Sequence, residues 1–133
     1  EVVDNHALLD ALENGWVSEA VVDTWENEPE LLLPLLDKVF IGTPHIAGYS
    51  ADGKANATNM VLQAFCRHFH LPILDKVLPP ALPADFVPSA DPEELALQLY
   101  NPHNDSRALR QNPSKFEELR GNYPLRREKM HTF

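Results

Sequence analysis

One histidine stands in a stretch whose neighbours could support proton transfer. His45 follows the apolar run of residues 39–41 and lies between Pro44 and a glycine-containing turn that continues to Ser50. An imidazole at the end of a predicted strand is either a turn or core residue, or a group placed to exchange a proton with a substrate. Taken alone, His45 fits the first interpretation better.

A carboxylate upstream changes that balance. Glu28 directly precedes Pro29, which disfavours a helical backbone at Glu28 and holds its side chain on an extended segment. If this loop meets the loop of His45, the carboxylate accepts a hydrogen bond from one imidazole nitrogen and orients the ring, which leaves the other nitrogen for proton exchange. The pattern predicts an acid/base pair, although Glu28 taken alone is more typical of a solvated carboxylate.

The elements expected ahead of this pair are a helix and a strand. Asp4 is the predicted N-cap of a helix that ends before Gly15, which supplies a left-handed C-cap. Residues 20–22 form a short apolar run bounded by polar residues, which is typical of a buried parallel strand. Asp23 falls at the carboxyl end of that strand.

The next elements are a helical turn, a second strand and a long helix. We expect the turn over residues 31–36, the strand over residues 39–41 and the helix from about 50 to 69. Helix, strand, short helix and strand is the order of an α/β sheet, whose ligands gather at the carboxyl ends of the strands. Both Asp23 and His45 lie at such ends.

The carboxyl-terminal half has a different character. Residues 72–92 contain 6 prolines, which remove hydrogen-bond donors and predict a connector or a set of edge segments. Short helices are expected over residues 92–100, 106–110 and 114–123. This part of the chain is poor in apolar residues, so we expect it to be a small helical module that depends on other contacts.

Composition disfavours several classes of function. The 133 residues include 11 Lys and Arg against 20 Asp and Glu, a formal charge of −9, which disfavours general binding to nucleic acid or to an anionic membrane. No apolar run approaches the roughly 20 residues that cross a bilayer. Cys66 is the only cysteine, so we expect no intrachain disulfide and a reducing, cytoplasmic setting. The start at Glu1, without methionine, predicts that an amino-terminal part of the same protein is missing.

Two stretches together resemble a known family. Residues 22–29, VDTWENEP, and residues 42–50, GTPHIAGYS, are similar to the carboxyl-terminal catalytic segment of the D-isomer-specific 2-hydroxyacid dehydrogenases. The resemblance implies an α/β fold and a homodimer. It divides the chain into the carboxyl-terminal part of a Rossmann-type NAD-binding domain (1–49), a long helix leading to the other domain (50–70), and a Pro-rich connector with a mainly helical dimerisation module (71–133).

The resemblance also implies a role for each site residue. His45 is expected to be the general acid/base on the C2 oxygen of the substrate, with Glu28 as its partner, while hydride passes to NAD. Asp23 would face the nicotinamide end of the cofactor, Gly48 would let the backbone approach the cofactor, and Tyr49 would contact the substrate. Asp23 equally fits a residue that merely ends a strand, and Tyr49 equally fits a packed ring.

The interval from Glu28 to His45, the stretch HIAGY and a weaker similarity in the carboxyl-terminal part, which ends in residues 116–128, together imply the substrate. They indicate the member of the family that oxidises the C2 hydroxyl of 4-phospho-D-erythronate in pyridoxal phosphate synthesis. The five glycines cannot form the Gly-x-Gly-x-x-Gly turn that cradles cofactor phosphates, and the family's substrate-binding arginine would precede Glu1, so we expect this chain alone to be inactive. Two alternatives stay open: a non-catalytic association fragment, and a dehydrogenase of another D-2-hydroxy acid. The choice between NAD and NADP is also open.

Two further groups carry weaker hypotheses. Cys66 and His70 have the i, i+4 spacing of a metal pair, but without a third ligand we predict no metal site. Arg120, Arg126 and Arg127 could hold a phosphate, although a solvated or salt-bridged tail is the favoured interpretation.

Overall fold

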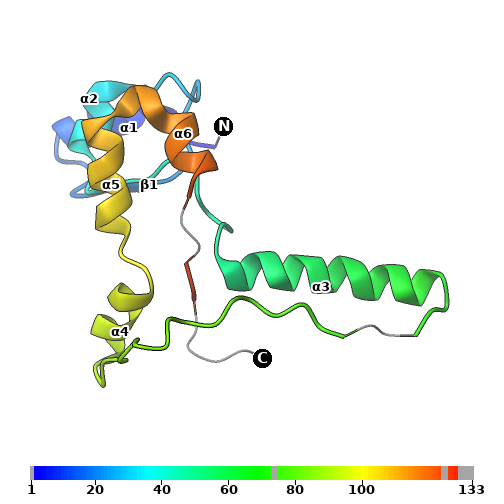
Figure 1. Ribbon diagram of the computed structural model, residues 1–133. Helices are drawn as coiled ribbons and strands as arrows, with labels where there is room; N and C mark the ends of the chain where they lie inside the picture. Colours follow the sequence, from blue (N-terminus) through cyan, green and yellow to red (C-terminus); the bar gives the residue numbers. More distant parts are fainter. Residues whose placement is uncertain (1, 73–74, 124–125, 129–133) are drawn as a thin grey trace. The chain divides into compact units, whose positions relative to one another are not determined.

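The computed structural model describes residues 2–72, 75–123 and 126–128 and is drawn in Figure 1. The chain forms two compact units. Unit 1 comprises residues 1–47 and 101–123, and unit 2 comprises residues 48–100 and 124–133. These boundaries differ from the three segments expected from the sequence, because residues 101–123 pack with the amino-terminal residues of unit 1.

Helix α1 (Asn5–Glu13) opens unit 1 and is capped at both ends. The Asp4 side chain accepts a hydrogen bond of 2.9 Å from the N–H of Ala7, which satisfies one of the free donors of the first turn. Gly15 follows the helix with a φ of +71°, a left-handed conformation that glycine adopts without a Cβ clash. The predicted helix and both of its predicted end signals are confirmed.

The sheet of unit 1 has two parallel strands, β1 (Val21–Val22) and β2 (Ile41–Gly42), with Val21 in register with Ile41. The expected order and direction of the strands are confirmed. The expectation that the first strand is buried is wrong at Val21, whose side chain is 67% exposed. In the described part of the chain β2 is the only strand beside β1, so the outer edge of β1 remains open.

A helix from the distant carboxyl-terminal half completes unit 1. Helix α5 (Pro102–Gln111) contacts the end of α2 (Leu33–Lys38) through Arg110. The guanidinium of Arg110 donates to the carbonyl oxygen of Leu36 over 3.1 Å and also to that of Val39. These carbonyl groups end a helix and would otherwise lack partners, so Arg110 acts as a cap that joins two elements.

The same helix also contacts the second strand. The N–H of Gly42 donates to Oγ of Ser106 over 3.1 Å, and Arg110 donates to the same oxygen over 2.7 Å. A Cβ atom at Gly42 would lie 2.9 Å from atoms of both Leu36 and Trp25, so this position requires the absence of a side chain. The close approach lets the indole pack directly against the strand that leads to His45.

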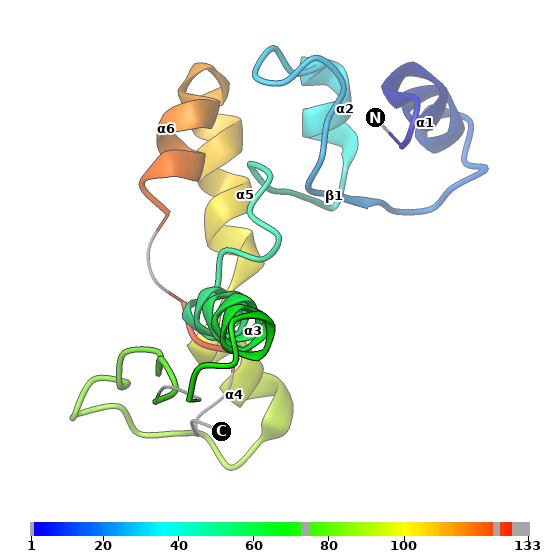
Figure 2. The same ribbon diagram turned by 90° about the vertical axis from the view of Figure 1, so that its right-hand side faces the viewer.

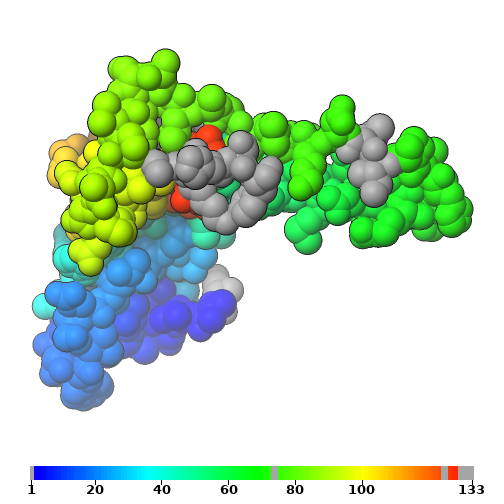
Figure 3. All heavy atoms as spheres, turned by 90° about the horizontal axis from the view of Figure 1, so that it is seen from below, coloured from blue at the N-terminus to red at the C-terminus, as the bar shows by residue number. Residues whose placement is uncertain are grey.

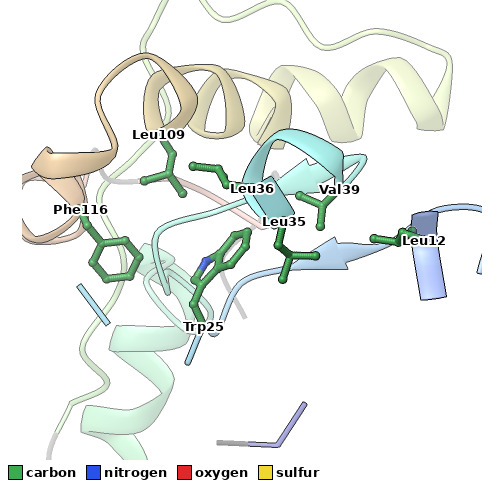
Figure 4. Packing of buried hydrophobic residues seen from close by; sticks show 7 residues of the cluster. All are labelled: Leu12, Trp25, Leu35, Leu36, Val39, Leu109 and Phe116. Atoms are coloured by element: carbon green, nitrogen blue, oxygen red, sulfur yellow. The ribbon is translucent and has the colours of Figure 1, made fainter. Parts of the chain in front are cut away.

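The core of unit 1 gathers side chains from the whole length of the unit. Figure 4 shows its seven buried members, which are Leu12, Trp25, Leu35, Leu36, Val39, Leu109 and Phe116. Phe116 begins α6 (Phe116–Gly121), which follows the short 3-10 helix η1 (Pro113–Lys115) and lies beside α5 in both ribbon views (Figures 1 and 2). Helix α5 begins four residues earlier than expected, because Pro102 is tolerated in a first helical turn.

Unit 2 is built on the 18-residue helix α3 (Ala51–His68), which Ser50 caps by accepting a hydrogen bond from the third residue of the helix. The chain then returns alongside α3, as the ribbon and the space-filling view show (Figures 1 and 3). The side chain of Asn59 exchanges two hydrogen bonds of 2.8 Å with the backbone of Val77. The Pro-rich connector contains no strand among its described residues. These two bonds hold it to α3 in place of the hydrogen bonds of a sheet.

Helix α4 (Pro92–Leu99) contributes little to a core. Asp91 caps it by accepting a hydrogen bond of 3.0 Å from the N–H of Glu93. None of its residues is buried, and Leu97 is 50% exposed. Leu97 therefore lies outside a core within the described residues.

A buried ion pair fastens the carboxyl-terminal segment within unit 2. Arg127 donates to both oxygens of Asp52, over 3.0 and 3.2 Å, and to the carbonyl oxygen of Pro80, while the N–H of Glu128 donates to Asp52 over 2.8 Å. Burial by itself raises the pKa of the Asp52 carboxyl, but the hydrogen bonds from Arg127 and Glu128 and the charge of Arg127 outweigh it and hold the pKa below its ordinary value. Arg127 is therefore salt-bridged and not a solvated tail residue.

Candidate acid/base site

The site is centred on a contact between two loops of unit 1. Nδ1 of His45 and Oε2 of Glu28 lie 2.7 Å apart. A carboxylate can only accept, so Nδ1–H is the donor and Nε2 is the nitrogen that can take up a proton. The two side chains are 39% and 19% exposed, which leaves the pair accessible to a small molecule. The contact expected from the sequence is therefore present.

Trp25 holds both loops of this pair. Its backbone N–H donates to the second carboxylate oxygen of Glu28 over 2.7 Å. Its indole Nε1–H donates over 2.9 Å to the carbonyl oxygen of Thr43, which lies just after β2. Trp25 is 4% exposed, so both bonds are shielded from competing water. One buried residue thus fixes the carboxylate and the strand end that carries the histidine loop.

Asp23 holds the turn around His45. Its Oδ1 accepts from Oγ1 of Thr43 over 2.7 Å and from the N–H of Ile46 over 2.8 Å, and its Oδ2 accepts from the N–H of Ala47 over 3.0 Å. His45 has a φ of +53°, a left-handed conformation that few residues other than glycine adopt. The three bonds of Asp23 lie on both sides of this unfavourable backbone and stabilise it.

A pocket of about 380 Å³ opens beside the pair. This volume lies within the range of small-molecule sites and suits a small acid or the reacting end of a cofactor. Its lining comes from the amino-terminal segment and from the two loops, and consists of Val2, Val3, Thr24, Trp25, Glu26, Asn27, Glu28 and His45. The arrangement can position a hydroxyl or carbonyl group against an oriented imidazole and can exchange one proton with it.

Two predicted site residues belong to unit 2. Gly48 has a φ of +78°, and no atom lies within 4 Å of the place where a Cβ would stand, so its backbone is open to close approach. Tyr49 is half-buried, and the Nζ of Lys54 lies 4.8 Å from the centre of its ring. The contact of Gly48 with a cofactor and that of Tyr49 with a substrate stay predictions.

The described residues hold no sign of a metal centre or of a membrane span. No group of three or more His, Cys, Asp or Glu side chains within them is arranged to bind a metal ion. Helix α3 ends at His68, before His70, so the helix that would align Cys66 with His70 is not continuous. In the same part of the chain, no helix combines the length and the apolar character that crossing a bilayer requires.

Sequence reasoning missed several residues that position the pair. Trp25 was not singled out, and neither were Thr43, Asn5 and Glu26, whose side chains or backbone groups bond directly to the two loops. Their partners lie 18 to 21 positions away in the chain. The one local signal was the position of Trp25 and Glu26 inside the WENEP stretch beside Glu28.

Comparison with known proteins matches the amino-terminal part of the chain to a family model. Residues 1–47 match the family model described as D-isomer specific 2-hydroxyacid dehydrogenase, NAD binding domain. The parallel strand pair and the contact between Glu28 and His45 lie within this matched range. Over these residues the chain is similar to the D-isomer-specific 2-hydroxyacid dehydrogenases.

Three individual proteins are similar to nearly the whole of this chain. The chain is 56% identical over 128 residues to a protein of Bacteroides thetaiotaomicron, and 42% identical over 134 residues to one of Porphyromonas gingivalis. A protein of Serratia proteamaculans is 43% identical over 138 residues. All three are named erythronate-4-phosphate dehydrogenase. Each comparison covers 96% of this chain but only 36 to 37% of the relative, so the chain spans little more than a third of their length.

Proposed function

We propose that the full-length protein oxidises the C2 hydroxyl of 4-phospho-D-erythronate to a ketone with NAD as the oxidant, a step of pyridoxal phosphate synthesis. The observation that carries this proposal is the distance of 2.7 Å between His45 and Glu28 beside an open pocket. Similarity to this family and the names of the relatives supply the reaction type and the substrate. In this proposal, the present chain provides the acid/base half of the site.

His45 and Glu28 carry the proton in this reaction. A bound NAD would supply the acceptor for the hydride of the C2–H bond, and Nε2 of His45 takes the proton of the C2 hydroxyl. The carboxylate of Glu28 holds Nδ1–H and stabilises the imidazolium that forms. In the reverse direction the same nitrogen returns the proton to the C2 oxygen.

The pocket beside the pair is proposed to receive the reacting end of the cofactor. The pocket admits a small acid, and the backbone of Gly48 is open to close approach, which supports its proposed contact with the cofactor. Asp23 is proposed to face the nicotinamide end in addition to holding the loop. Tyr49 is proposed to contact the substrate. The phosphate-cradling turn and the substrate-binding arginine would come from the rest of the full-length protein.

A variant of His45 tests this assignment. His45→Asn in the full-length protein should lower kcat by about 10² to 10⁴, the range that general acid/base catalysis contributes. Asparagine tolerates the left-handed backbone of this position better than most residues, so the turn should keep its conformation. The measurement is steady-state turnover together with the affinity for NADH, which should stay within about 2-fold.

The matched control is His6→Asn, which changes an exposed histidine on α1. It should leave turnover unchanged. Turnover of the His45→Asn variant within a few-fold of the parent would remove His45 from the mechanism. Activity of the parent on another 2-hydroxy acid, but not on 4-phospho-D-erythronate, would replace the substrate and keep the chemistry.

A second proposed role is association. We propose that residues 71–133 include a dimerisation module and that α3 leads towards the substrate domain. The support is that α4 has no buried residue, although it carries Leu97, and that Val87 in the connector is 78% exposed. Apolar side chains left open in this way are typical of a contact with a second subunit. We place the protein in the cytoplasm, because a single cysteine and a soluble phosphorylated substrate suit that compartment.

A further inference from the structure

Two polar side chains outside the acid/base pair interlock across 21 positions of the chain. The N–H of Asn5 donates to Oε2 of Glu26 over 2.8 Å, and the N–H of Glu26 donates to Oδ1 of Asn5 over 3.1 Å. The side chain of Asn5 is 2% exposed and also donates, through Nδ2, to the carbonyl oxygen of Val3 over 3.1 Å. We call the reciprocal pair the Asn5–Glu26 clamp.

One side of the clamp belongs to the turn that carries Glu28. Glu26 lies between Trp25, whose N–H donates to Glu28, and Asn27, whose φ of +59° marks a tight left-handed turn. The bonds of Glu26 therefore act on the backbone that presents the carboxylate to His45. The Glu28 carboxylate itself keeps its own bonds to the N–H of Trp25 and to His45.

The other side of the clamp belongs to a wall of the pocket. Val2 and Val3 line the same pocket as Glu28 and His45. These valines are 94% and 51% exposed, so packing against a core holds them only weakly. The bonds at Asn5, one of which reaches the carbonyl of Val3, connect this wall to the turn that carries Glu28.

We propose that Asn5 and Glu26 are positioning residues. The clamp sets the distance between the Val2–Val3 wall and the acid/base pair, and thereby determines how tightly the pocket holds a small hydroxy acid. This inference rests on the proposed function and adds to it two residues that hold no proton and transfer none. It predicts an effect on substrate affinity rather than on the chemical step.

A purely structural role of the clamp makes a different prediction. Asn5 is the first residue of α1, and its N–H is a donor that the helix cannot satisfy, so Glu26 could serve only as a remote acidic cap. Loss of such a cap would destabilise α1 and unit 1 as a whole. It would not separate KM from kcat among the molecules that remain folded.

The experiment uses steady-state kinetics of the full-length enzyme with 4-phospho-D-erythronate. Asn5→Ala and Glu26→Ala should each raise KM by roughly 5- to 10-fold and leave kcat within about 2-fold, as expected for lost hydrogen bonds that act equally on bound substrate and transition state. Because the two residues act through each other, the double variant should be about as impaired as the worse single variant. Glu26→Gln keeps one acceptor for the Asn5 N–H and should restore KM to within about 2-fold of the parent.

Glu30→Ala is the matched control, because Glu30 is an exposed carboxylate a few residues further along the same loop. It should leave both constants unchanged. Unchanged KM in Asn5→Ala and Glu26→Ala would overturn the proposal. So would a fall in kcat and melting temperature without a change in KM.

Amide hydrogen exchange separates failure of the clamp from failure of the proposed function. In Glu26→Ala the Trp25 amide, which donates to Glu28, should exchange at least roughly 10-fold faster, while the amide of Val39 in the core keeps its rate. A parent without turnover would refute the proposed function, and faster exchange confined to Trp25 would still support the clamp. Exchange that is unchanged, or accelerated equally at Val39, would overturn the clamp.

Discussion

At the scale of single residues, the backbone of His45 explains why Asp23 matters. A left-handed conformation costs a residue with a side chain of this size about 1 to 3 kcal/mol and persists only where its surroundings impose it. The carboxylate of Asp23 provides that constraint through Thr43, Ile46 and Ala47. In the structure, Asp23 therefore stabilises the loop that carries His45. Its contact with a cofactor is a separate proposal.

Gly42 carries a prediction about packing. In Gly42→Ala, the new methyl carbon would lie 2.9 Å from side-chain atoms of both Leu36 and Trp25. The strand backbone cannot move away from them without losing its bond to Ser106. We expect the free energy of unfolding to fall by about 1 to 3 kcal/mol, the usual cost of overpacking a core. Urea denaturation followed by tryptophan fluorescence measures this change.

The control for that substitution is Gly121→Ala. Gly121 ends α6, and no atom lies within 4 Å of its Cβ position. Alanine should leave stability unchanged or raise it by up to about 1 kcal/mol, because it favours a helix over the unfolded chain. Equal destabilisation by both substitutions would show that the lost glycine, and not the contact with Trp25, is responsible.

The sequence predicted the acid/base pair but not the residues that hold it. Glu28 and His45 could be named because each lies in a short stretch with a recognisable family pattern. The bonds of Trp25 to Thr43 and of Asn5 to Glu26 join positions 18 and 21 apart. Hydrophobic periodicity carries no information about such pairings, because they depend on how separate elements meet.

At the scale of elements, the buried ion pair makes α3 and the carboxyl-terminal segment of unit 2 sensitive to acid. The pKa of Asp52 is lowered in the folded protein, so its contribution to stability is complete above the ordinary carboxyl pKa near 3.8 and is lost as the pH falls through the lowered pKa. Asp52→Asn leaves Arg127 buried without a counter-charge. The free energy of unfolding of this variant at pH 7 should therefore be lower than that of the parent by about 3 kcal/mol.

Thermal unfolding between pH 7 and pH 2.5 measures that effect. The loss of stability of the parent below pH 4 should be partly absent in Asp52→Asn, because the variant has no carboxyl group to protonate at this position. The control is Asp85→Asn, which changes an exposed carboxylate of the connector and should reproduce the parent curve. Parallel curves for the parent and Asp52→Asn would contradict the prediction.

Element ends were predictable where their signals are local. Asp4 and Gly15 fix the ends of α1 through a bond and a backbone angle within a few residues, and the sequence identifies both. The start of α5 at Pro102 was missed, because the helix was expected only from residue 106, although proline is tolerated at a first helical position. The exposure of Val21 was also missed, since burial depends on which neighbours flank a strand and not on its own residues.

At the scale of the whole molecule, unit 1 is discontinuous in sequence. Leu109 and Phe116 complete the cluster that contains Trp25, so the expected division at residue 70 would separate parts of one core. Removing residues 71–133 would therefore damage unit 1 as well as any dimerisation module. Point substitutions on exposed residues test association more cleanly than truncation does.

Association is predicted to depend on exposed apolar side chains of the connector and of α4. In the full-length protein, the double variant Val87→Asp and Leu97→Asp should shift the mass from dimer to monomer, because charges in an apolar contact lose hydration without gaining partners. Sedimentation velocity over a range of concentrations measures this shift.

The control for association is Val61→Asp, which changes a side chain on α3 that is 70% exposed and lies outside the proposed module. It should leave the mass of the dimer unchanged. A monomeric parent, or a double variant that sediments as the parent does, would discard the dimerisation role of residues 71–133.

The late return of α5 and α6 to unit 1 also has a consequence for synthesis on the ribosome. When residue 100 has left the exit tunnel, the nascent chain already contains both members of the acid/base pair, but Leu109 and Phe116 have not yet reached Trp25. Residues 1–47 therefore cannot complete their packing before the chain has emerged to about residue 116. Until then, the indole that orders both loops stays open to chaperones.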